Sequence, residues 1–392
     1  MERMLASACD SEISSLHHDY SRLRAQGSYP EEITMHMWAV VRNGQPLEAL
    51  DLPTPVPAGA EVLVRVSHCG VCHSDLHFWE GEYNLGHGKK VRLTDRGVTL
   101  PRAPGHEVVG TVVAVGPDVQ EVKVGDRRIV YPWIGCGNCQ RCRAGHDNLC
   151  MSMSSIGVVR HGGFSTHVLV PHFKYLVDPG GLDPAVAATY ACSGLTVLSA
   201  IRKLGTMEPS SPVLLMGAGG LGHSAIAMLR ALGHSNILVV DIDQSKRDAV
   251  LMAGATDFID GNVEDLSAEI VRRAGGPVYY ALDFVNTSKT ANAAFNSLGK
   301  DGKLVLLGLA GGELDIPLAA MVFMPRTVVG SSTGSLQDLK DVVELALSGK
   351  LKPIPVSLMR AELANEALMR LRCGRVPGRI ILDYSMQSGE AS

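Results

Sequence analysis

The sequence lacks three features that mark specialised classes of protein. Its 36 lysines and arginines are outnumbered by 40 acidic residues, so there is no broad basic surface for the phosphates of a nucleic acid. No apolar run reaches the ~18–20 residues that a membrane span needs. With 46% hydrophobic and 19% charged residues, the composition also excludes a disordered chain. We therefore expect a globular protein that binds neither nucleic acid nor membrane, and 392 residues favour two or three domains.

Signals for export are also missing. The N-terminal region has no apolar core of a signal peptide, and its acidic residues argue against a transit peptide. The nine cysteines are an odd number, and four of them lie between positions 136 and 150. This distribution favours metal binding in a reducing compartment over a secreted disulfide framework. The cytoplasm is therefore the predicted location.

Residues 1–34 stand apart as an N-terminal extension. Apolar residues recur there at three- and four-residue spacing among polar ones, which predicts a short amphipathic helix over about 11–25. This extension is expected either to pack on its own subunit or to take part in a subunit contact.

Two domains follow, and their local patterns differ. Residues 35–182 contain short β-rich runs separated by glycine and proline, which is typical of a largely β domain. Residues 183–330 alternate strand-like with helical runs, which predicts an α/β domain with a doubly wound parallel sheet. The last segment, 331–392, is expected to return to the first domain. The expected strands are 62–66, 108–115, 128–130, 213–216, 237–241, 281–285, 303–307 and 379–384, and the expected helices are 222–232, 245–253 and 336–347.

A glycine motif joins the first strand of the second domain to its first helix. The run Gly217-Ala218-Gly219-Gly220-Leu221-Gly222 has the GxGxxG pattern, which is weak alone but specific between a strand and a helix. Gly217 would permit the tight turn, Gly219 would let the backbone approach a pyrophosphate, and Gly222 would let helix and strand pack closely. The helix N-terminus adds unpaired N–H groups and a positive dipole end. The motif therefore predicts a dinucleotide site.

The choice of dinucleotide depends on an acidic residue roughly twenty positions further on, at the end of the second strand. Asp241 ends the predicted strand 237–241, and Asp243 is a nearby competitor for the same role. A carboxylate suits a free ribose hydroxyl and repels a 2′-phosphate, so NAD is favoured over NADP.

Four cysteines with short spacings form the second signal. Cys136, Cys139, Cys142 and Cys150 follow the pattern CxxCxxCx₇C, and four thiolates on one loop complete a tetrahedral zinc site. The usual bacterial iron–sulfur motif has three residues before its last cysteine and a proline after it. Here the gap is seven and Met151 follows, so a structural zinc is favoured over an iron–sulfur cluster.

Several motifs occur in a fixed order along the chain. They are Cys72-His73-Ser74-Asp75-Leu76-His77, Gly105-His106-Glu107, the four-cysteine lobe (residues 136–150), Ala191-Cys192-Ser193-Gly194-Leu195-Thr196 and the glycine run. Together they resemble the zinc-dependent alcohol dehydrogenases of the medium-chain dehydrogenase/reductase family, and the resemblance covers roughly residues 37–385. It implies a GroES-like catalytic domain beside a Rossmann domain and a catalytic zinc on Cys72, His106 and Cys192.

The same resemblance implies roles for single residues. Zinc would lower the pKa of a bound alcohol so that an alkoxide transfers hydride to the nicotinamide. Ser74 and His77 would relay the proton to solvent, and Asp75 would orient His106. Glu107 would lie beside the zinc as a transient ligand, and Trp79 and Trp133 would either wall the substrate pocket or belong to the core. Cofactor contacts are implied for His73, Thr196, Gly220, Leu221, Lys246 and Arg379.

Some features depart from the family pattern. The extension and the long polar connection over 79–104, either a lid or a plain insertion, exceed the usual length. The short interval from Cys150 to Cys192 resembles tetrameric microbial members more than dimeric animal ones, so a homo-oligomer is expected and a tetramer is favoured over a dimer.

Three alternatives remain. Polyol dehydrogenases of the family commonly carry a carboxylate where Cys192 stands, and cinnamyl-alcohol-like members usually favour NADP. A catalytically silent, zinc-stabilised binding protein is the alternative of another class. NADH-linked turnover on a panel of small alcohols and aldehydes distinguishes the last from an enzyme.

Overall fold

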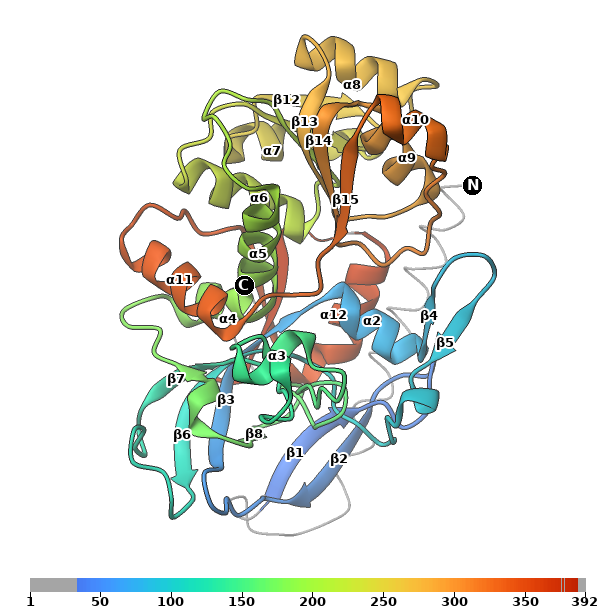
Figure 1. The fold of residues 1–392 in the computed structure, drawn as a ribbon. Helices are drawn as coiled ribbons and strands as arrows, with labels where there is room; N and C mark the ends of the chain where they lie inside the picture. Colours follow the sequence, from blue (N-terminus) through green and yellow to red (C-terminus); the bar gives the residue numbers. More distant parts are fainter. Residues whose placement is uncertain (1–33, 375, 377, 387–392) are drawn as a thin grey trace. The chain divides into compact units, whose positions relative to one another are not determined.

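The computed structural model describes residues 34–374, 376 and 378–386, so the helix predicted over 11–25 lies outside the described residues. The chain divides into two compact units (Figure 1). Of the described residues, the first unit holds 34–82, Leu93–Ala191 and those from Pro355 onward. The second unit holds Tyr83–Arg92 and Cys192–Ile354.

The first unit is built on a seven-stranded, mostly antiparallel sheet. Its strands follow the order β16-β17-β3-β6-β7-β9, and β8 pairs with β3. Valine supplies most of the buried positions of β3 and β6, as expected for strands that pack on both faces. The strands are β3 (Val62–Val71), β6 (Glu107–Val115), β7 (Arg127–Val130), β8 (His167–Val170), β9 (Leu176–Val177), β16 (Val356–Arg360) and β17 (Arg379–Asp383).

Shorter elements complete the first unit. A separate antiparallel pair, β1 with β2, buries Met35 and Met37 against Ala103. Helix α2 begins just after β3, and α3 lies between the second and last cysteines of the lobe. These elements are β1 (Thr34–Ala39), β2 (Glu48–Pro53), α2 (His73–Glu80), α3 (Gln140–Arg143), α4 (Pro184–Thr189) and α12 (Ala364–Arg372).

The second unit is a six-stranded parallel sheet with helices, which confirms the doubly wound prediction. The strand order is β12-β11-β10-β13-β14-β15, so the chain reverses direction across the sheet at β10. All four residues of β10 are buried, as expected for a strand covered on both faces. The strands are β10 (Val213–Met216), β11 (Ile237–Asp241), β12 (Asp257–Asp260), β13 (Val278–Asp283), β14 (Leu298–Leu306) and β15 (Arg326–Gly330).

The helices of the second unit follow the strands in alternation. Strands 213–216 and 237–241 and the helix 336–347 have the bounds predicted from the sequence. The helices are α5 (Leu195–Leu204), α6 (Gly220–Ala231), α7 (Arg247–Ala253), α8 (Leu266–Ala274), α9 (Ser288–Asn296), α10 (Leu318–Phe323) and α11 (Leu336–Leu347).

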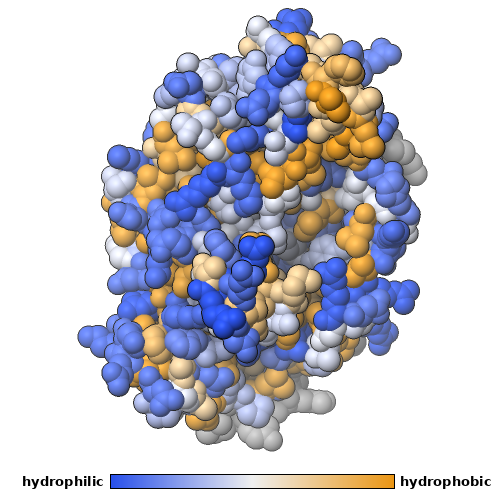
Figure 2. Space-filling view, in the orientation of Figure 1, coloured by the Kyte–Doolittle hydropathy of each residue, from blue (hydrophilic) through white to orange (hydrophobic). Residues whose placement is uncertain are grey.

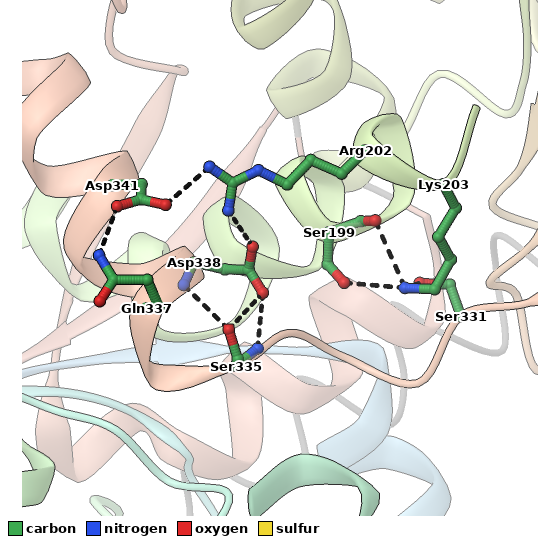
Figure 3. Close-up of polar contacts among 8 residues, drawn as sticks. All are labelled: Ser199, Arg202, Lys203, Ser331, Ser335, Gln337, Asp338 and Asp341. Carbon is green, nitrogen blue, oxygen red and sulfur yellow. Dashed lines mark hydrogen bonds and ion pairs between the residues drawn. The ribbon is translucent and has the colours of Figure 1, made fainter. Parts of the chain in front are cut away.

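The return to the first unit comes later than predicted, at Pro355 rather than at 331, because α11 packs on α5. Figure 3 shows the contact: Arg202 of α5 forms ion pairs with Asp338 and, at 2.6 Å, with Asp341. The Asp338 carboxylate also accepts the backbone N–H of Ser335 at 2.8 Å and so caps α11. These charged contacts are formed inside the second unit and are not visible in the local pattern of residues 331–354.

The connection predicted over 79–104 contains regular structure. It contains the hairpin of β4 (Glu82–Asn84) and β5 (Lys90–Arg92), whose turn places Gly86 and Gly88 at positive φ. An isolated two-stranded hairpin is only marginally stable, and this one is bonded to the second unit through the backbone N–H of His87, which donates to Glu313 at 2.6 Å.

One continuous helical run, Pro184–Leu204, has the length and hydropathy of a membrane-spanning helix. In its most apolar window, 83% of the residues are buried inside the protein, so it is a core helix of this fold. The run joins α4 to α5 through a π-helical turn, Tyr190–Gly194.

Candidate metal and dinucleotide sites

The first candidate site begins where β3 ends and α2 starts. Cys72 is the N-cap residue of α2, and its backbone N–H donates to Asp75 Oδ2 at 2.8 Å. The other carboxylate oxygen of Asp75 accepts the backbone N–H of Gly105 at 3.0 Å and lies 3.2 Å from Nδ1 of His106. One buried carboxylate therefore holds the segments that carry Cys72 and His106.

His106 immediately precedes β6 and is 2% exposed. Gly105 before it has φ +92°, and a Cβ there would lie 2.5 Å from Cδ1 of Phe164, so only glycine fits this approach. Because Asp75 occupies Nδ1, the imidazole offers Nε2, which is buried and has no hydrogen-bond partner. A buried nitrogen without a partner costs free energy unless a ligand satisfies it.

Cys192 completes this cluster from the π-helical turn Tyr190–Gly194, a type of turn that is frequent at functional sites. Ala191 is the last residue of this segment of the first unit, and Cys192 follows it in the same helical turn. The backbone of Cys192 therefore continues the helix of the first unit. One ligand atom each from Cys72, His106, Glu107 and Cys192 lie within 4.8 Å of one another, and all four side chains are buried.

This donor set fits zinc. Zinc binds cysteine sulfur and histidine nitrogen at about 2.0–2.3 Å, so ligand atoms around one ion lie near the separation seen here. Two thiolates and a neutral imidazole balance the charge of the ion, and a set of three protein ligands is the pattern of catalytic zinc sites. The partnerless Nε2 of His106 supports this fit.

Glu107 lies beside these ligands with no exposed surface, and it forms an ion pair with Arg379 at 3.3 Å. Burial raises the pKa of Glu107 to about 7 although the Arg379 guanidinium acts in the opposite direction. Gly70 makes room for this carboxylate, since a Cβ there would lie 1.9 Å from Oε2 of Glu107. The sequence pointed to both Glu107 and Arg379 but not to their pairing, which depends on β3, β6 and β17 being neighbours in the sheet.

The remaining predicted residues of this site lie on α2 or near the cluster. Ser74 Oγ is 3.9 Å from the sulfur of Cys72, and His77 is half-buried one turn further on, with Nδ1 3.4 Å from Glu80. His73 is the first residue of α2 and is exposed.

The two tryptophans have different surroundings. The ring of Trp133 lies 5.4 Å from that of His106, next to the candidate ligands. Trp79 donates its indole N–H to the carbonyl of Gln45 at 2.6 Å and packs under the guanidinium of Arg372 at 5.5 Å. Trp133 thus lies next to the candidate ligands, whereas the contacts of Trp79 are those of a packed, buried residue.

The four-cysteine lobe (residues 136–150) forms a second cluster. Its four sulfur atoms lie within 4.8 Å of one another, with Cys139 and Cys142 only 3.4 Å apart. Backbone N–H groups of Asn138 and Cys139 lower the pKa of Cys136 to about 6, whereas burial raises the pKa of Cys142 to about 12. Four thiol groups at this separation fit a closed tetrahedral zinc site.

Two features of the lobe were not predicted. Gly135 is required by the fold, since a Cβ there would lie 2.5 Å from the sulfur of Cys142. Asp147 is buried and accepts the hydroxyl of Tyr175 at 2.8 Å, and this bond attaches the lobe to the residues before β9. The available signal was an aspartate between two of the four cysteines, two residues after Gly145.

The glycine run has the geometry of a phosphate-binding turn. It follows β10 and opens α6; Gly217 has φ +103°, and a Cβ on Gly222 would lie 2.2 Å from the carbonyl oxygen of Gly217. A Cβ on Gly219 would meet nothing within 4 Å, so open space lies over the N-terminus of α6. Gly220 and Leu221 form the first turn of that helix.

The second strand of this unit brings its terminal carboxylate to the same turn. Asp241 ends β11, and its Oδ2 accepts the backbone N–H of Ala218 at 2.7 Å. The ammonium of Lys246 lies 3.2 Å from both oxygens of Asp241. Thr196 is buried in the first turn of α5, and its hydroxyl has no hydrogen-bond partner. Asp243 is instead the half-buried N-cap of the short helix Gln244–Lys246.

Fold and sites together define a two-unit protein that combines a candidate Cys₂His metal centre with a dinucleotide-binding sheet. Two family models match the chain: the alcohol dehydrogenase GroES-like domain over residues 58–178 and the zinc-binding dehydrogenase domain over residues 220–348. The NAD-dependent alcohol dehydrogenase of Sulfurisphaera tokodaii is 36% identical over 350 residues, which are 89% of this chain and 99% of the relative.

Two further comparisons find relatives of the same kind. The crystal structure of the alcohol dehydrogenase of Aeropyrum pernix superposes with a TM-score of 0.80 at 28% identity, covering 89% of this chain and 99% of that one. The D-arabinose 1-dehydrogenase (NADP⁺) of Saccharolobus solfataricus is 34% identical and covers 86% of this chain and 94% of the relative. The chain therefore belongs to the zinc-type alcohol dehydrogenases of the medium-chain dehydrogenase/reductase family and is an oxidoreductase.

Proposed function

We propose that this protein interconverts alcohols with aldehydes or ketones by hydride transfer with NAD, and that each chain holds a catalytic and a structural zinc. The buried cluster of Cys72, His106 and Cys192, with the partnerless Nε2 of His106, is the observation that carries this proposal. The test is a panel of alcohols and aldehydes followed by NAD(P)H absorbance. If zinc-loaded protein shows no turnover on any of these compounds, the proposal is wrong and the protein is a catalytically silent binding protein.

Bound zinc supplies a Lewis acid for the substrate oxygen, and NAD supplies the hydride acceptor or donor. Cys72, His106 and Cys192 hold the metal, and Asp75 fixes the tautomer and orientation of His106 through Nδ1. Glu107 is kept beside the ligands by Arg379 as an exchangeable fourth donor. Trp133, next to His106, excludes water from the substrate side of the cluster.

We assign the proton relay to Ser74 and His77. The hydroxyl of Ser74 lies 3.9 Å from the sulfur of Cys72, so it is close to where a substrate oxygen would bind. A hydroxyl both accepts and donates a hydrogen bond, and an imidazole titrates near neutral pH. His77, one turn further along α2, has a side chain 25% exposed and can pass the proton outward.

Replacing His77 with glutamine should lower alcohol oxidation by about 10²-fold at most, with the largest loss at acidic to neutral pH, because proton release then lacks its base. Turnover against pH is the measurement, and added imidazole should restore part of the rate. Ser74→Ala should cost more because it acts on the reacting oxygen. His87→Gln, on the β4–β5 turn, is the control and should behave as wild type. A His77→Gln enzyme with weak NAD binding, an unchanged pH profile and no rescue would remove His77 from the relay.

We further propose that Asp241 sets a preference for NAD. Its carboxylate ends β11 beside the glycine run, and Lys246 is neutralised by it at 3.2 Å. In Asp241→Asn the acceptor for the N–H of Ala218 remains, while the negative charge is lost and Lys246 is freed to meet a 2′-phosphate.

The ratio of kcat/KM for NADP to that for NAD should rise by about tenfold or more in Asp241→Asn, since a like-charge repulsion of ~1–3 kcal/mol is removed. Asp243→Asn is the matched control, because Asp243 caps a helix instead, and its ratio should stay at the wild-type value. An unaltered enzyme that already prefers NADP would contradict the assignment.

A homo-oligomer, with a tetramer favoured over a dimer, and a cytoplasmic location complete the proposal. In the second unit, β15 is one of the two edge strands of the parallel sheet, and β12 is the other. The preceding helix, α10, exposes Leu318, Val322 and Phe323 to at least 77%, and Figure 2 shows the apolar surface at this place. An open strand edge next to exposed apolar side chains is typical of a contact between subunits. Sedimentation of the full chain measures the subunit number.

A further inference from the structure

A pocket in the first unit lies apart from both cysteine clusters. Its volume is about 380 Å³, within the range of small-molecule sites (~300–1,000 Å³). Its lining comes from the strands β1 and β8, from Arg102 before β6, and from the loop that carries Arg160 and His161. None of the candidate zinc ligands is among the lining residues. We call it the arginine pocket and define it by Arg102, Arg160, His161, His167, Met35 and Leu169.

The polar side of the arginine pocket is cationic, and no carboxylate of the described residues is among its lining. Among the described residues, no carboxylate forms an ion pair with Arg102 or Arg160. Arg102 donates to Thr99 at 2.9 Å, while its Nε is buried without a hydrogen-bond partner. Arg160 donates from Nε to Ser154 at 3.1 Å, and no bond from its two terminal nitrogens is formed within the described chain. Guanidinium N–H groups that have no acceptor in the protein are available to bind an anion.

The pKa shifts of the lining groups have the directions expected for two neighbouring positive charges. Burial, and next the charge of Arg160, lower the pKa of Arg102, which shows that the two guanidiniums repel one another. Burial and the charge of Arg102 lower the pKa of His161 to about 4, so this ring is neutral at pH 7. Burial and Arg65 likewise lower the pKa of His167. An anion between Arg102 and Arg160 would relieve the repulsion.

The rest of the lining is apolar. Met35 of β1, Val159 and Leu169 of β8 face the same space as the two arginines. His161 accepts the N–H of Ala103 through Nδ1 at 3.3 Å, so its neutral ring carries its proton on Nε2 and adds a donor. A purely inorganic anion would leave the apolar wall without a partner.

We propose that the arginine pocket is a second ligand site, which binds a small organic carboxylate: the carboxylate between Arg102 and Arg160, the hydrocarbon part against Met35, Val159 and Leu169. The site does not depend on the proposed dehydrogenase activity, because it shares no residue with the metal cluster or the glycine run.

Calorimetric titration of the full-length, zinc-loaded protein with hexanoate tests this. The expected result is saturable binding that weakens by about tenfold or more in Arg160→Gln and in Arg102→Gln, with inorganic phosphate weaker than hexanoate. Arg127→Gln, an exposed arginine on β7, is the matched control and should bind as wild type. Cys72→Ala should also bind as wild type, which separates this pocket from hexanoate bound at the catalytic zinc.

Four outcomes overturn the proposal: equal binding of the neutral hexanamide, binding unchanged in both arginine variants, binding lost in Cys72→Ala, or binding that is detected only after residues 1–33 are deleted. If Arg160→Gln does not fold, Arg160→Lys keeps the charge but loses the planar fork. It should bind hexanoate more weakly than wild type, and wild-type binding by it would count against a carboxylate held by both arginines.

Discussion

Replacing Cys72 with alanine is expected to remove one of two zinc ions and to lower alcohol turnover by about 10³-fold or more. Cys72 offers one of the three ligands of the buried cluster, and two remaining ligands hold zinc poorly. A Lewis acid contributes several kcal/mol to the transition state, and each ~1.4 kcal/mol is a factor of ten in rate. Elemental analysis gives the zinc content, and NADH absorbance gives the turnover.

The fold should survive this change. Cys72 caps α2 mainly through its backbone N–H to Asp75, which alanine retains. Cys69→Ala is the matched control: this buried thiol lies three residues earlier on β3 and belongs to neither cluster. It should keep both zinc ions and its turnover. Freshly purified wild-type protein with a single zinc per chain would contradict the scheme, as would near-normal turnover by Cys72→Ala.

The parts of both sites that lie close together in the sequence could be predicted from it. The four-cysteine lobe and the glycine run each occupy a short stretch of sequence. The spacing of their residues therefore indicates the geometry that zinc or a pyrophosphate requires. The strand before the glycine run, β10, and the strand after α6, β11, are parallel and mostly buried and apolar. Their bounds were therefore also predicted correctly. Local chemistry and local structure agree there, and sequence reasoning succeeds.

The parts that depend on sheet pairing could not be predicted by spacing. Cys72, His106 and Cys192 are brought together because β3 pairs with β6 and the helix of α4 packs on both strands. Only the family resemblance connected the three residues. The pairing of Glu107 with Arg379 depends on β17 entering the same sheet from the far end of the chain.

The boundary at Pro355 and the arginine pocket have the same explanation. Arg202 and Asp338 are 136 positions apart, and nothing in the residues near either one indicates an ion pair. The pocket draws on residues from Met35 to Leu169, and each of its arginines alone looks like an ordinary surface residue. Long-range contacts of this kind are set by packing, which a single sequence does not display.

Replacing Cys139 with alanine should destabilise the protein instead of merely inactivating it. Between Cys136 and Cys150, all of which the structure describes, the buried side chains are those of Cys142, Asp147, Asn148 and Cys150, and none is a large hydrocarbon. Leu149, the one large apolar residue of the lobe, is 43% exposed. The hydrophobic effect therefore contributes little here, and the free energy that orders the lobe must come from metal ligation.

Structural zinc contributes ~10–16 kcal/mol in isolated zinc-finger peptides, so losing one ligand of four should cost at least ~3 kcal/mol. For a domain of this size that corresponds to a fall in Tm of roughly 6–12 °C. Calorimetry measures the Tm, and limited proteolysis followed by mass spectrometry should find new cuts between residues 136 and 150. A zinc chelator should produce the same cuts in the wild type.

Leu149→Ala is the control from within the lobe, and it should change the unfolding free energy by about 0.5 kcal/mol or less because the side chain is already exposed. The bond from Tyr175 to Asp147 offers a competing explanation for the order of the lobe, because it attaches one end of the lobe to the residues before β9 without metal. If this attachment were sufficient, Cys139→Ala would keep the wild-type Tm and resist protease. The zinc would then be dispensable for the lobe, and ligation would not be what orders it.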